Sequence, residues 1–402
     1  MGHTTKIAMI GVGAISGIYL QNITHTFSEL ELVGLCDLIP ERAQKGVDYV
    51  KGEIEKGAKV RVPKIYKDMY EAFDDPEVEL VLNITRPYEH FDVTKQALLH
   101  GKHVYSEKPL AVDMEEATEL VALAQKQGLQ LGGAPDTFMG AGIQTARQVI
   151  DSGMIGDPLG ATCAMVCHGH ETWHPDPEFY YKRGGGPMMD MGPYYVTALV
   201  QLLGEAKSVF GMTKKSFTDR IITSEPHRGE HIAVDVDTHL TGSIEFSNGA
   251  IAQICTTFDV YYPWTSQARF EVYGTKGTLV VPDPNTFGGP VMLLRPEDMA
   301  AAPAVDPALM KKGRPDPYMG YKEIPLMFDY CVNSRALGLA DMAKALKTGR
   351  GHRADYQQQL HVLEILTSFS KSSASGERVK LTTKYARTAP MANNPMHGIL
   401  DD

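Results

Sequence analysis

The sequence predicts an α/β domain with a doubly wound parallel sheet, followed by an α+β domain with an open, mostly antiparallel sheet flanked by helices. Two patterns predict these classes: short apolar runs alternate with helical segments in the first third of the chain, and longer alternating strands follow. A length of 402 residues also exceeds that of one ordinary domain, so more than one domain is expected. The pattern changes near residue 135, so we expect domains at 1–134 and 135–402.

The composition indicates a folded protein and excludes several functional classes. Hydrophobic residues make up 43% and charged residues 22%, which is typical of globular proteins. The net charge of -10 disfavours nucleic acid and anionic membranes as partners, and no apolar run is long enough to span a membrane. Five scattered cysteines and an N-terminus without a secretory pattern favour a reducing compartment. We therefore expect a cytoplasmic protein that acts on a small molecule.

Short apolar runs predict five parallel strands in the first domain. They cover residues 6–10, 30–36, 78–84, 103–106 and 129–131. The clearest helix between them begins after Asp113, where Glu116 completes a capping box, and ends at Gly128. Strands that alternate with helices in this way are typical of parallel sheets.

A glycine-rich turn after the first strand is typical of a dinucleotide site. Gly11 permits the tight turn, Gly13 allows the backbone to approach a pyrophosphate, and Ser16 is small enough for close helix packing. The start of the next helix, with Ala14 and Ile15, offers backbone N–H groups to the phosphates. These features predict a Rossmann domain.

Asp37, at the end of the second strand, is predicted to select the cofactor. A carboxylate at this position accepts hydrogen bonds from the ribose hydroxyls of NAD and repels the 2′-phosphate of NADP. Arg42 follows closely and could accommodate a phosphate instead. We expect NAD rather than NADP.

Three further motifs are TRPYEH at 85–90, EKP at 107–109 and GGGPMMDMGPY at 184–194. The first two follow predicted strands, at the edge where a doubly wound sheet binds its ligands. With these motifs the chain resembles the Gfo/Idh/MocA oxidoreductases, named for glucose-fructose oxidoreductase and inositol dehydrogenase, over nearly its whole length. The resemblance implies that the EKP lysine, Lys108, is catalytic.

The same resemblance implies a wider cofactor site. Its further residues are Thr85, Pro87, His90, Glu107 and Lys108. The chain departs from the common family pattern at Tyr194, where many members have a histidine, and at Thr197, where many have a second aspartate. Both departures argue against a straightforward inositol dehydrogenase.

Asp190 and Tyr194 are predicted to complete the catalytic group. They are four residues apart and would share one side of the first turn if Asp190 begins the helix that continues through 196–203. A helix cap and a buried tyrosine are the alternatives. Beside the EKP motif, we expect Lys108 and Tyr194 to flank the reacting oxygen and Asp190 to orient the lysine or a neighbouring hydroxyl. Burial beside an oxidised nicotinamide is expected to lower the pKa of Lys108.

A polar and aromatic cluster in the second domain predicts the substrate site. Its residues, together with the two just described, are His168, Glu171, Trp173, His174, Tyr180, Asp190 and Tyr194. Hydrogen-bonding groups beside a flat apolar face suit a sugar ring. A polar loop at the sheet edge is the alternative. Cys163 and Cys167 also permit a zinc interpretation, but their even spacing puts them on one face of a strand, as core residues would be, so no metal is expected.

The remaining elements of the second domain follow from periodicity. Strands are expected at 235–246, 250–260 and 268–273, with a hairpin turn at 274–277, and helices at 141–152, 336–347 and 356–370. The resemblance implies that one face of the sheet packs against another subunit. We therefore expect a homodimer or homotetramer formed through the C-terminal sheet.

These observations predict an NAD(P)-dependent oxidoreductase that transfers a hydride between nicotinamide and a secondary alcohol or ketone of a sugar, glycoside or cyclitol. Three alternatives remain open: a glycosidase or lyase that recycles tightly bound NAD, a dihydrodiol-type dehydrogenase, and a non-catalytic regulator that senses a nucleotide or sugar. The residues do not identify the sugar or the direction of reaction.

Overall fold

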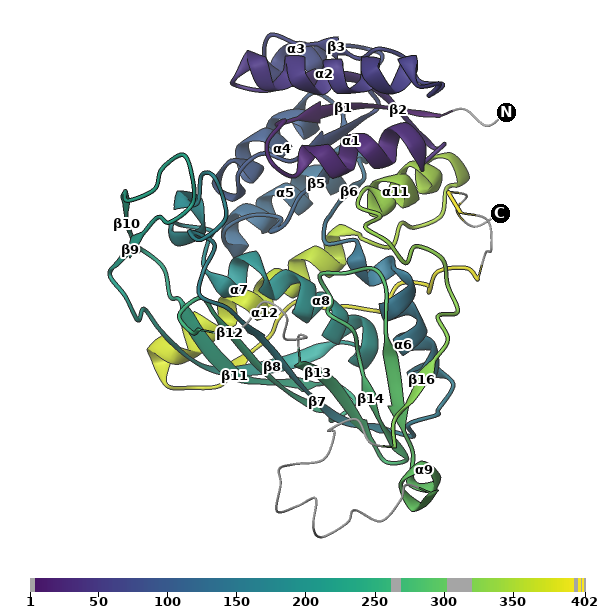
Figure 1. The fold of residues 1–402 in the computed structure, drawn as a ribbon, viewed down its shortest axis with the longest axis vertical. Helices are drawn as coiled ribbons and strands as arrows, with labels where there is room; N and C mark the ends of the chain where they lie inside the picture. The colour runs from purple at the N-terminus through teal and green to yellow at the C-terminus, as the bar shows by residue number, and fades with distance from the viewer. Residues whose placement is uncertain (1–3, 262–268, 302–319, 394–396, 399, 401–402) are drawn as a thin grey trace.

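The computed structural model describes residues 4–261, 269–301, 320–393, 397–398 and 400. Two sheets dominate the molecule, one above the other in the view of Figure 1. The predicted α/β and α+β classes are confirmed. Within the described ranges, no helix is long and apolar enough to cross a membrane.

The first sheet has six parallel strands in the order β3-β2-β1-β4-β5-β6. They are β1 Thr5–Ile10, β2 Leu30–Cys36, β3 Lys64–Ile65, β4 Leu80–Asn83, β5 His103–Ser106 and β6 Leu131–Gly133. The central strands are largely buried because helices cover both faces, as in other parallel sheets. Five of these strands match the predicted runs, whereas the two-residue β3 has no apolar run to predict it.

Helices connect these strands. They are α1 Ser16–His25, α2 Pro40–Glu55, α3 Met69–Asp74, α4 His90–Leu99 and α5 Met114–Gln127. The predicted ends of α5 are confirmed: the Asp113 side chain accepts from the Glu116 backbone N–H at 3.0 Å, and Gly128 ends the helix with a φ of 67°.

The second sheet has nine strands in the order β16-β15-β14-β13-β7-β12-β11-β8-β17, and β7 and β12 form its one parallel pair among the described residues. The strands are β7 Pro158–Val166, β8 Ala206–Lys214, β11 His239–Phe246, β12 Ile251–Thr257, β13 Arg269–Gly274, β14 Gly277–Val280, β15 Val291–Leu294, β16 Lys322–Ile324 and β17 Val379–Lys380. A separate pair consists of β9 Asp219–Ile221 and β10 His231–Ala233.

Helices cover one face of this second sheet. They include α6 Ala141–Asp151, α7 Pro187–Asp190, α8 Gly192–Leu203 and α12 Tyr356–Ser375. The helix α11 Leu337–Thr348 instead packs beside β6 of the first sheet, and the short α9 Pro296–Ala301 lies at the far end of the second sheet. On β7, β8 and β12 the side chains of Leu159, Met212 and Ile251 are each more than half exposed. The subunit contact expected through this sheet stays a prediction.

The predicted strand at 235–246 begins later than expected. β11 starts at His239, because the preceding residues leave the sheet, where the Asp235 N–H donates to the Tyr181 carbonyl. The strand expected at 250–260 ends at Thr257. The hairpin turn is confirmed by the pairing of Gly274 with Gly277, whereas residue 268 of the third expected strand lies outside the described residues.

The C-terminal part of the chain returns to the first domain. The Gly133 N–H donates to the Ala354 carbonyl at 3.0 Å, and the Gln359 side chain donates to the Gly133 carbonyl at 2.7 Å. Helix α12 therefore packs against β6 as well as against the second sheet. These contacts hold the two sheets in a fixed relation around the site described next.

Candidate active site

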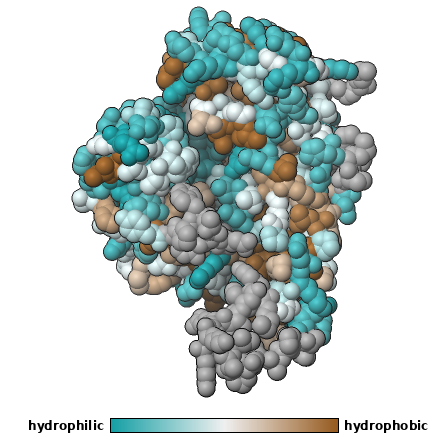
Figure 2. All heavy atoms as spheres, in the orientation of Figure 1, coloured by the Kyte–Doolittle hydropathy of each residue, from teal (hydrophilic) through white to brown (hydrophobic). Residues whose placement is uncertain are grey.

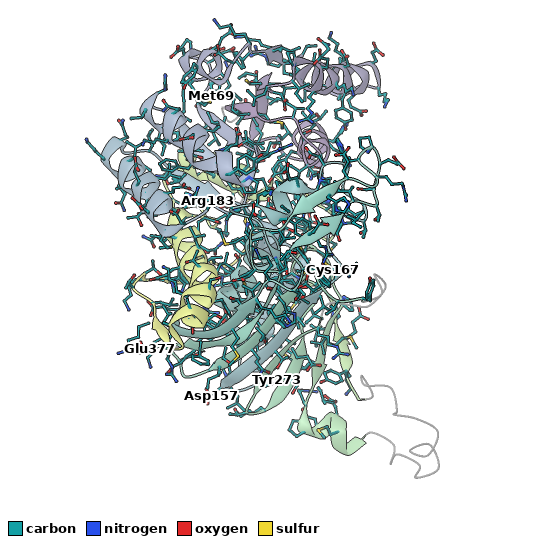
Figure 3. The ribbon with its side chains drawn as sticks, turned by 90° about the vertical axis from the view of Figure 1, so that its left-hand side faces the viewer. Met69, Asp157, Cys167, Arg183, Tyr273 and Glu377 are labelled. Atoms are coloured by element: carbon teal, nitrogen blue, oxygen red, sulfur yellow. The ribbon has the colours of Figure 1, made fainter. Side chains whose placement is uncertain are left out.

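The candidate active site lies where the two sheets meet. The loops that follow β4 and β5 contact the second domain, because Arg86 pairs with Asp176 and Lys108 pairs with Asp190. Figure 3 shows Cys167, just after β7, at the end of the second sheet that faces the first domain. Asp157 and Tyr273 lie at the opposite end of that sheet. Figure 2 shows apolar side chains gathered between the two parts of the molecule. The candidate active site therefore lies between loops of both domains.

The glycine-rich turn has the shape that a dinucleotide requires. Gly11 has a φ of 91°, and a Cβ there would lie 2.9 Å from the Ile84 carbonyl oxygen, so no other residue fits. A Cβ on Gly13 would meet nothing within 4 Å, which leaves room above the backbone for phosphates. No side chain caps α1 at Ile15, and the Ser16 hydroxyl donates to the Gly13 carbonyl at 2.7 Å.

The exposed residues of this turn complete the cradle. Ala14 and Ile15 lie at the surface, directly before the first turn of α1. The uncapped N–H groups and the helix dipole at this end favour an anion. The predicted phosphate residues therefore fit a dinucleotide, whose binding remains a prediction for them.

Asp37 supports the turn and faces the place expected for the adenosine ribose. Its carboxylate accepts from the Val12 N–H at 2.6 Å and from the Ile39 N–H at 2.8 Å, and the residue is only half-buried. Arg42 lies exposed in the first turn of α2. The carboxylate is thus held at the carboxyl end of β2.

We expect Asp37→Asn and Asp37→Ser to shift the cofactor preference towards NADP, because both remove the charge that opposes a 2′-phosphate. The ratio of kcat/KM for NADH to that for NADPH should fall by about tenfold or more. Asp37→Asn keeps an acceptor for the Val12 N–H, and the exposed Asp48→Asn serves as the control. An unchanged ratio in both variants would assign cofactor choice to another residue.

Asn83, which the sequence analysis did not identify, shapes the loop after β4. Its amide oxygen accepts from the Thr85 hydroxyl at 2.7 Å, and its amide nitrogen donates to Thr94 at 3.0 Å. Thr85 and Pro87 remain partly exposed towards the site. A buried asparagine at a strand end carries no motif of its own, so only the fold reveals it.

His90 has a different place from the one expected. It is 1% exposed, with Nδ1 2.7 Å from the Pro109 carbonyl oxygen and Nε2 3.1 Å from the Thr85 carbonyl oxygen. Burial lowers its pKa. Since neither ring nitrogen faces outwards, His90 joins the two motif loops, and the expectation of a direct contact with the cofactor is corrected.

Lys108 and Asp190 form a buried ion pair between the domains. The Lys108 ammonium donates to the Asp190 carboxylate and to the Asp190 carbonyl, each at 2.7 Å. Glu107 orients the lysine loop, since its carboxylate accepts from the Lys108 N–H at 3.0 Å and from the Tyr19 hydroxyl at 2.7 Å. The EKP turn is therefore fixed on both sides of the lysine.

The ion pair decides the charges in the site. Burial would lower the pKa of Lys108, but Asp190, Tyr194 and Glu107 together outweigh burial, and the pKa lies above its ordinary value. Burial would raise the pKa of Asp190, but Lys108 and His170 hold it well below its ordinary value. The lowering of the Lys108 pKa expected beside an oxidised nicotinamide stays a prediction.

Tyr194 lies beside the pair. The Lys108 ammonium is 5.2 Å from the centroid of its ring, and the Arg335 guanidinium carbon is 6.0 Å away. Burial raises the pKa of Tyr194, while both cations act in the opposite direction. The structure therefore brings together the three residues predicted to be catalytic and adds Arg335, which no motif marked.

The local helix differs from the prediction. Asp190 is the last residue of α7, and α8 begins at Gly192 with Pro193 in its first turn. The Tyr194 N–H donates to the Met191 carbonyl rather than to Asp190. Because the chain turns between the two helices, the Asp190 carboxylate points at Lys108 instead of capping α8.

His170, rather than His168, touches the catalytic group. Its Nε2 lies 3.0 Å from the Asp190 carboxylate, and its Nδ1 accepts from the Trp173 indole at 3.1 Å. His168 instead stacks on Tyr261, with ring centroids 3.9 Å apart. Strand β7 ends at Val166, so both histidines lie in the loop that follows it, where His170 reaches Asp190.

Aromatic rings surround His170. Trp173 is 52% exposed, and the ring of Tyr180 lies 4.5 Å from the imidazole centroid. His174 packs edge-on against Trp173 and Tyr180, and burial lowers its pKa. The predicted substrate residues Trp173, His174 and Tyr180 therefore form one wall beside Asp190, and their contact with substrate stays a prediction.

Glu171 has a structural role. Arg220 binds one of its carboxylate oxygens, with the Nε donor at 2.9 Å, and the Tyr181 hydroxyl donates to the other. The pair is almost completely buried, and Asp259 also contacts Arg220, at 3.3 Å. No carboxylate oxygen of Glu171 faces a substrate, so the expectation that it contacts the sugar is corrected.

The half-buried Arg86 and the exposed Arg183 connect the domains beside this wall. Arg86 pairs with Asp176 and stacks near Phe179. Arg183, labelled in Figure 3, donates to Asp113 at 2.6 Å. These contacts place the loop after β7 over the end of the first sheet.

The cysteines of the zinc interpretation lie in the core. Cys163 and Cys167 are both buried, and burial raises the pKa of each thiol. In the part of the chain that the structure describes, no group of three histidine, cysteine or acidic side chains is placed to hold a metal.

Comparison with known families matches both halves of the chain to one family. Residues 5–133 match the NAD-binding Rossmann-fold domain of the GFO/IDH/MocA oxidoreductases, and residues 143–280 match a GFO/IDH/MocA C-terminal domain. Together the matches cover more than half of the chain and include Lys108, Asp190 and Tyr194.

Among curated relatives, an inositol 2-dehydrogenase/D-chiro-inositol 3-dehydrogenase of Lactiplantibacillus plantarum is 30% identical over 39% of this chain, and the chain covers 43% of that protein's length. A myo-inositol 2-dehydrogenase of Thermotoga maritima is 24% identical, covering 68% of this chain and 74% of the relative. A solved levoglucosan dehydrogenase in complex with NADH and L-sorbose has the same fold, with a TM-score of 0.75 and 19% identity over 94% of this chain and 99% of that one.

Proposed function

The chain belongs to the Gfo/Idh/MocA family of oxidoreductases, and from that premise we propose that it is an NAD-dependent dehydrogenase or reductase acting on a secondary alcohol or ketone of a sugar, glycoside or cyclitol. The observation that carries the proposal is the constellation of Lys108, Asp190 and Tyr194 at the carboxyl ends of the first sheet. Relatives named as inositol and sugar dehydrogenases support the substrate class.

The turn around Gly11 and Gly13 would hold the diphosphate, Asp37 the adenosine ribose, and the EKP loop the nicotinamide end. When bound, nicotinamide supplies or accepts the hydride. Because a reduced ketone gains a proton at its oxygen, the site needs a proton donor beside that atom.

Lys108 is the proton donor in this proposal. Asp190 keeps the lysine charged and fixes the direction of its ammonium, since the two groups are 2.7 Å apart. The Tyr194 hydroxyl gives the substrate oxygen a second donor. In the oxidation direction Lys108 must first release its proton to solvent, and the neutral amine then takes the proton of the alcohol. His170 restrains the second carboxylate oxygen of Asp190 and so stabilises the pair.

Tyr194→Phe tests the second donor. We expect the single-turnover rate of nicotinamide oxidation or reduction to fall about 100-fold, because the variant loses the hydroxyl but keeps the ring that Lys108 contacts. Tyr195→Phe, on the next residue of α8 with its ring against Phe270, is the matched control and should react normally. A normal rate in Tyr194→Phe would leave Lys108 alone with the proton transfer.

The proposed function is tested by following NADH and NADPH absorbance with panels of pyranoses, glycosides, cyclitols and keto sugars, alongside mass analysis of any nucleotide that copurifies. A net change in absorbance with one of these substrate classes supports an ordinary dehydrogenase. Product formation without net absorbance change would instead support a recycling glycosidase or lyase. Binding of nucleotide with no product from any panel would favour a sensor.

A further inference from the structure

Arg335 lies beside the hydroxyl of Tyr194. The residue is in the segment before α11, and its guanidinium carbon is 6.0 Å from the centroid of the Tyr194 ring. A side-chain hydrogen bond joins the guanidinium to the Tyr194 hydroxyl. An arginine side chain has five N–H donors and no acceptor, so the tyrosine oxygen must accept in this bond.

The charge of Arg335 is compensated. Burial would lower the pKa of Arg335, but Tyr194 and the carboxylates of Asp136 and Glu107 outweigh burial, and the pKa lies above its ordinary value. The guanidinium is therefore always protonated and always a donor in this site. Because carboxylates balance its charge, Arg335 provides a fixed hydrogen-bond donor rather than surplus positive charge.

Other hydrogen bonds hold the guanidinium in front of Tyr194. It donates to the amide oxygen of Asn285 at 2.7 Å and to that of Asn333 at 2.8 Å. The backbone is held as well, because the Asn22 side chain of α1 donates to the Arg335 carbonyl at 2.7 Å. A helix of the first domain and a loop of the second domain therefore fix the position of this donor.

Two hydrogens at the catalytic group remain free for a substrate. The Lys108 ammonium has three hydrogens, and the Asp190 carboxylate and carbonyl accept two of them. Among the residues that the structure describes, the Tyr194 hydroxyl has only its bond with Arg335, in which the oxygen accepts. The hydrogen of this hydroxyl therefore points away from the guanidinium. One N–H of Lys108 and the O–H of Tyr194 are left to donate to one substrate oxygen.

We propose that Arg335 is a positioning residue, which donates to the Tyr194 oxygen and thereby directs the phenolic hydrogen to the oxygen of the reacting ketone or alcohol. This role rests on the proposed function. When a ketone is reduced, its carbon gains the hydride, and its oxygen gains the electron pair of the C=O π bond and then the proton of Lys108. The Tyr194 hydrogen stabilises the negative charge that develops on that oxygen. Arg335 acts through Tyr194 and does not contact the substrate.

Arg335 also strengthens Tyr194 as a donor. Burial raises the pKa of Tyr194, whereas Lys108 and Arg335 act in the opposite direction. A hydroxyl whose oxygen accepts from a charged group is polarised, so its own hydrogen is donated more strongly. The orientation and the strength of the second donor thus depend on the same hydrogen bond.

Neutron diffraction of the perdeuterated wild-type protein tests the direction of the hydrogen bond without turnover. We expect a deuterium of the guanidinium between Arg335 and the Tyr194 oxygen, and the deuterium of the hydroxyl on the side away from Arg335. A hydroxyl deuterium directed at a protein acceptor such as the Glu107 carboxylate would overturn the assignment. A guanidinium with no deuterium directed at the tyrosine oxygen would overturn it as well.

A double-mutant cycle tests whether Arg335 acts through the hydroxyl. Single-turnover rates are compared for wild type, Arg335→Met, Tyr194→Phe and the double variant. We expect Arg335→Met to slow wild type about 10–100-fold, as for the loss of one hydrogen bond from a charged donor, but to slow Tyr194→Phe no more than about twofold. Arg378→Met, an exposed arginine paired with Glu245, should react at the wild-type rate. Equal losses in both backgrounds would overturn the role of Arg335.

The two experiments separate the role of Arg335 from the proposed function. Turnover with equal losses in both backgrounds keeps the proposed function and overturns the role of Arg335. A wild-type protein that turns over no panel substrate contradicts the proposed function, and the deuterium positions then decide the role of Arg335 on their own. They also decide it if Arg335→Met does not fold.

Discussion

Replacing Lys108 with methionine is expected to abolish turnover while leaving NADH binding within a few-fold of wild type. Methionine keeps the apolar stem beside Tyr194 but removes the ammonium that Asp190 holds at 2.7 Å. Loss of a positioned proton donor costs about 10²–10⁴-fold in rate. The steady-state rate and the quenching of protein fluorescence by NADH measure the two quantities separately.

The matched control for this variant is Lys182→Met. Lys182 is half-buried and pairs with the exposed Asp235 away from Lys108, so its replacement changes the net charge equally and removes no group of the site. If Lys108→Met turned over substrate as fast as Lys182→Met, Lys108 would have no role in proton transfer. If its NADH affinity fell as far as its rate, Lys108 would act in cofactor binding instead.

Asp190→Asn is expected to give the second largest effect, a fall in kcat of about 100-fold with a changed pH profile. Asp190 raises the pKa of Lys108, so without the carboxylate the lysine loses its proton at lower pH. The alkaline limb of the reduction rate should therefore move to lower pH. The pH dependence of kcat/KM measures this shift, and Asp235→Asn, an exposed carboxylate, is the control.

The same change should alter stability. Removing one partner of a buried ion pair lowers the free energy of unfolding by about 3–5 kcal/mol. Because the asparagine can still accept a hydrogen bond, we expect the loss in Asp190→Asn to be at or below the lower end of this range. The native pKa of Asp190 is below its unfolded value, so its contribution is present above the unfolded pKa and is lost as pH falls. Urea denaturation should show a smaller loss of unfolding free energy on acidification in Asp190→Asn than in wild type. Equal acid dependence would show that the pair does not stabilise the fold.

Features that depend on neighbouring residues were predictable. The capping box of α5 and the positive φ of Gly11 follow from local sequence, because short turns and helix ends are determined by residues a few positions apart. The parallel order of the first sheet follows from strand and helix alternation. Lys108 follows β5 in the first domain and Asp190 ends α7 in the second domain. The two residues meet because these ends face each other where the domains pack together.

Features that depend on distant partners were not predictable. Glu171 was predicted to contact the substrate. Its partner Arg220 lies 49 residues away, so no local sequence pattern reveals that the carboxylate is already bound. His168 and His170 both lie in the loop after β7, and the contact of His170 with Asp190, 20 residues away, distinguishes them. Arg335 belongs to no motif, and its place beside Tyr194 arises from the return of the chain to α1.

Transfer of deuterium from NADH labelled at the nicotinamide C4 position tests the central claim most directly. Wild-type protein is incubated with the keto sugar that gives the greatest change in the absorbance panel, and the product is analysed by mass spectrometry, with Lys108→Met in parallel. The account predicts one deuterium on the carbinol carbon of the product, formed by wild type and not by the variant. An unlabelled product formed at the same rate by both proteins would contradict it.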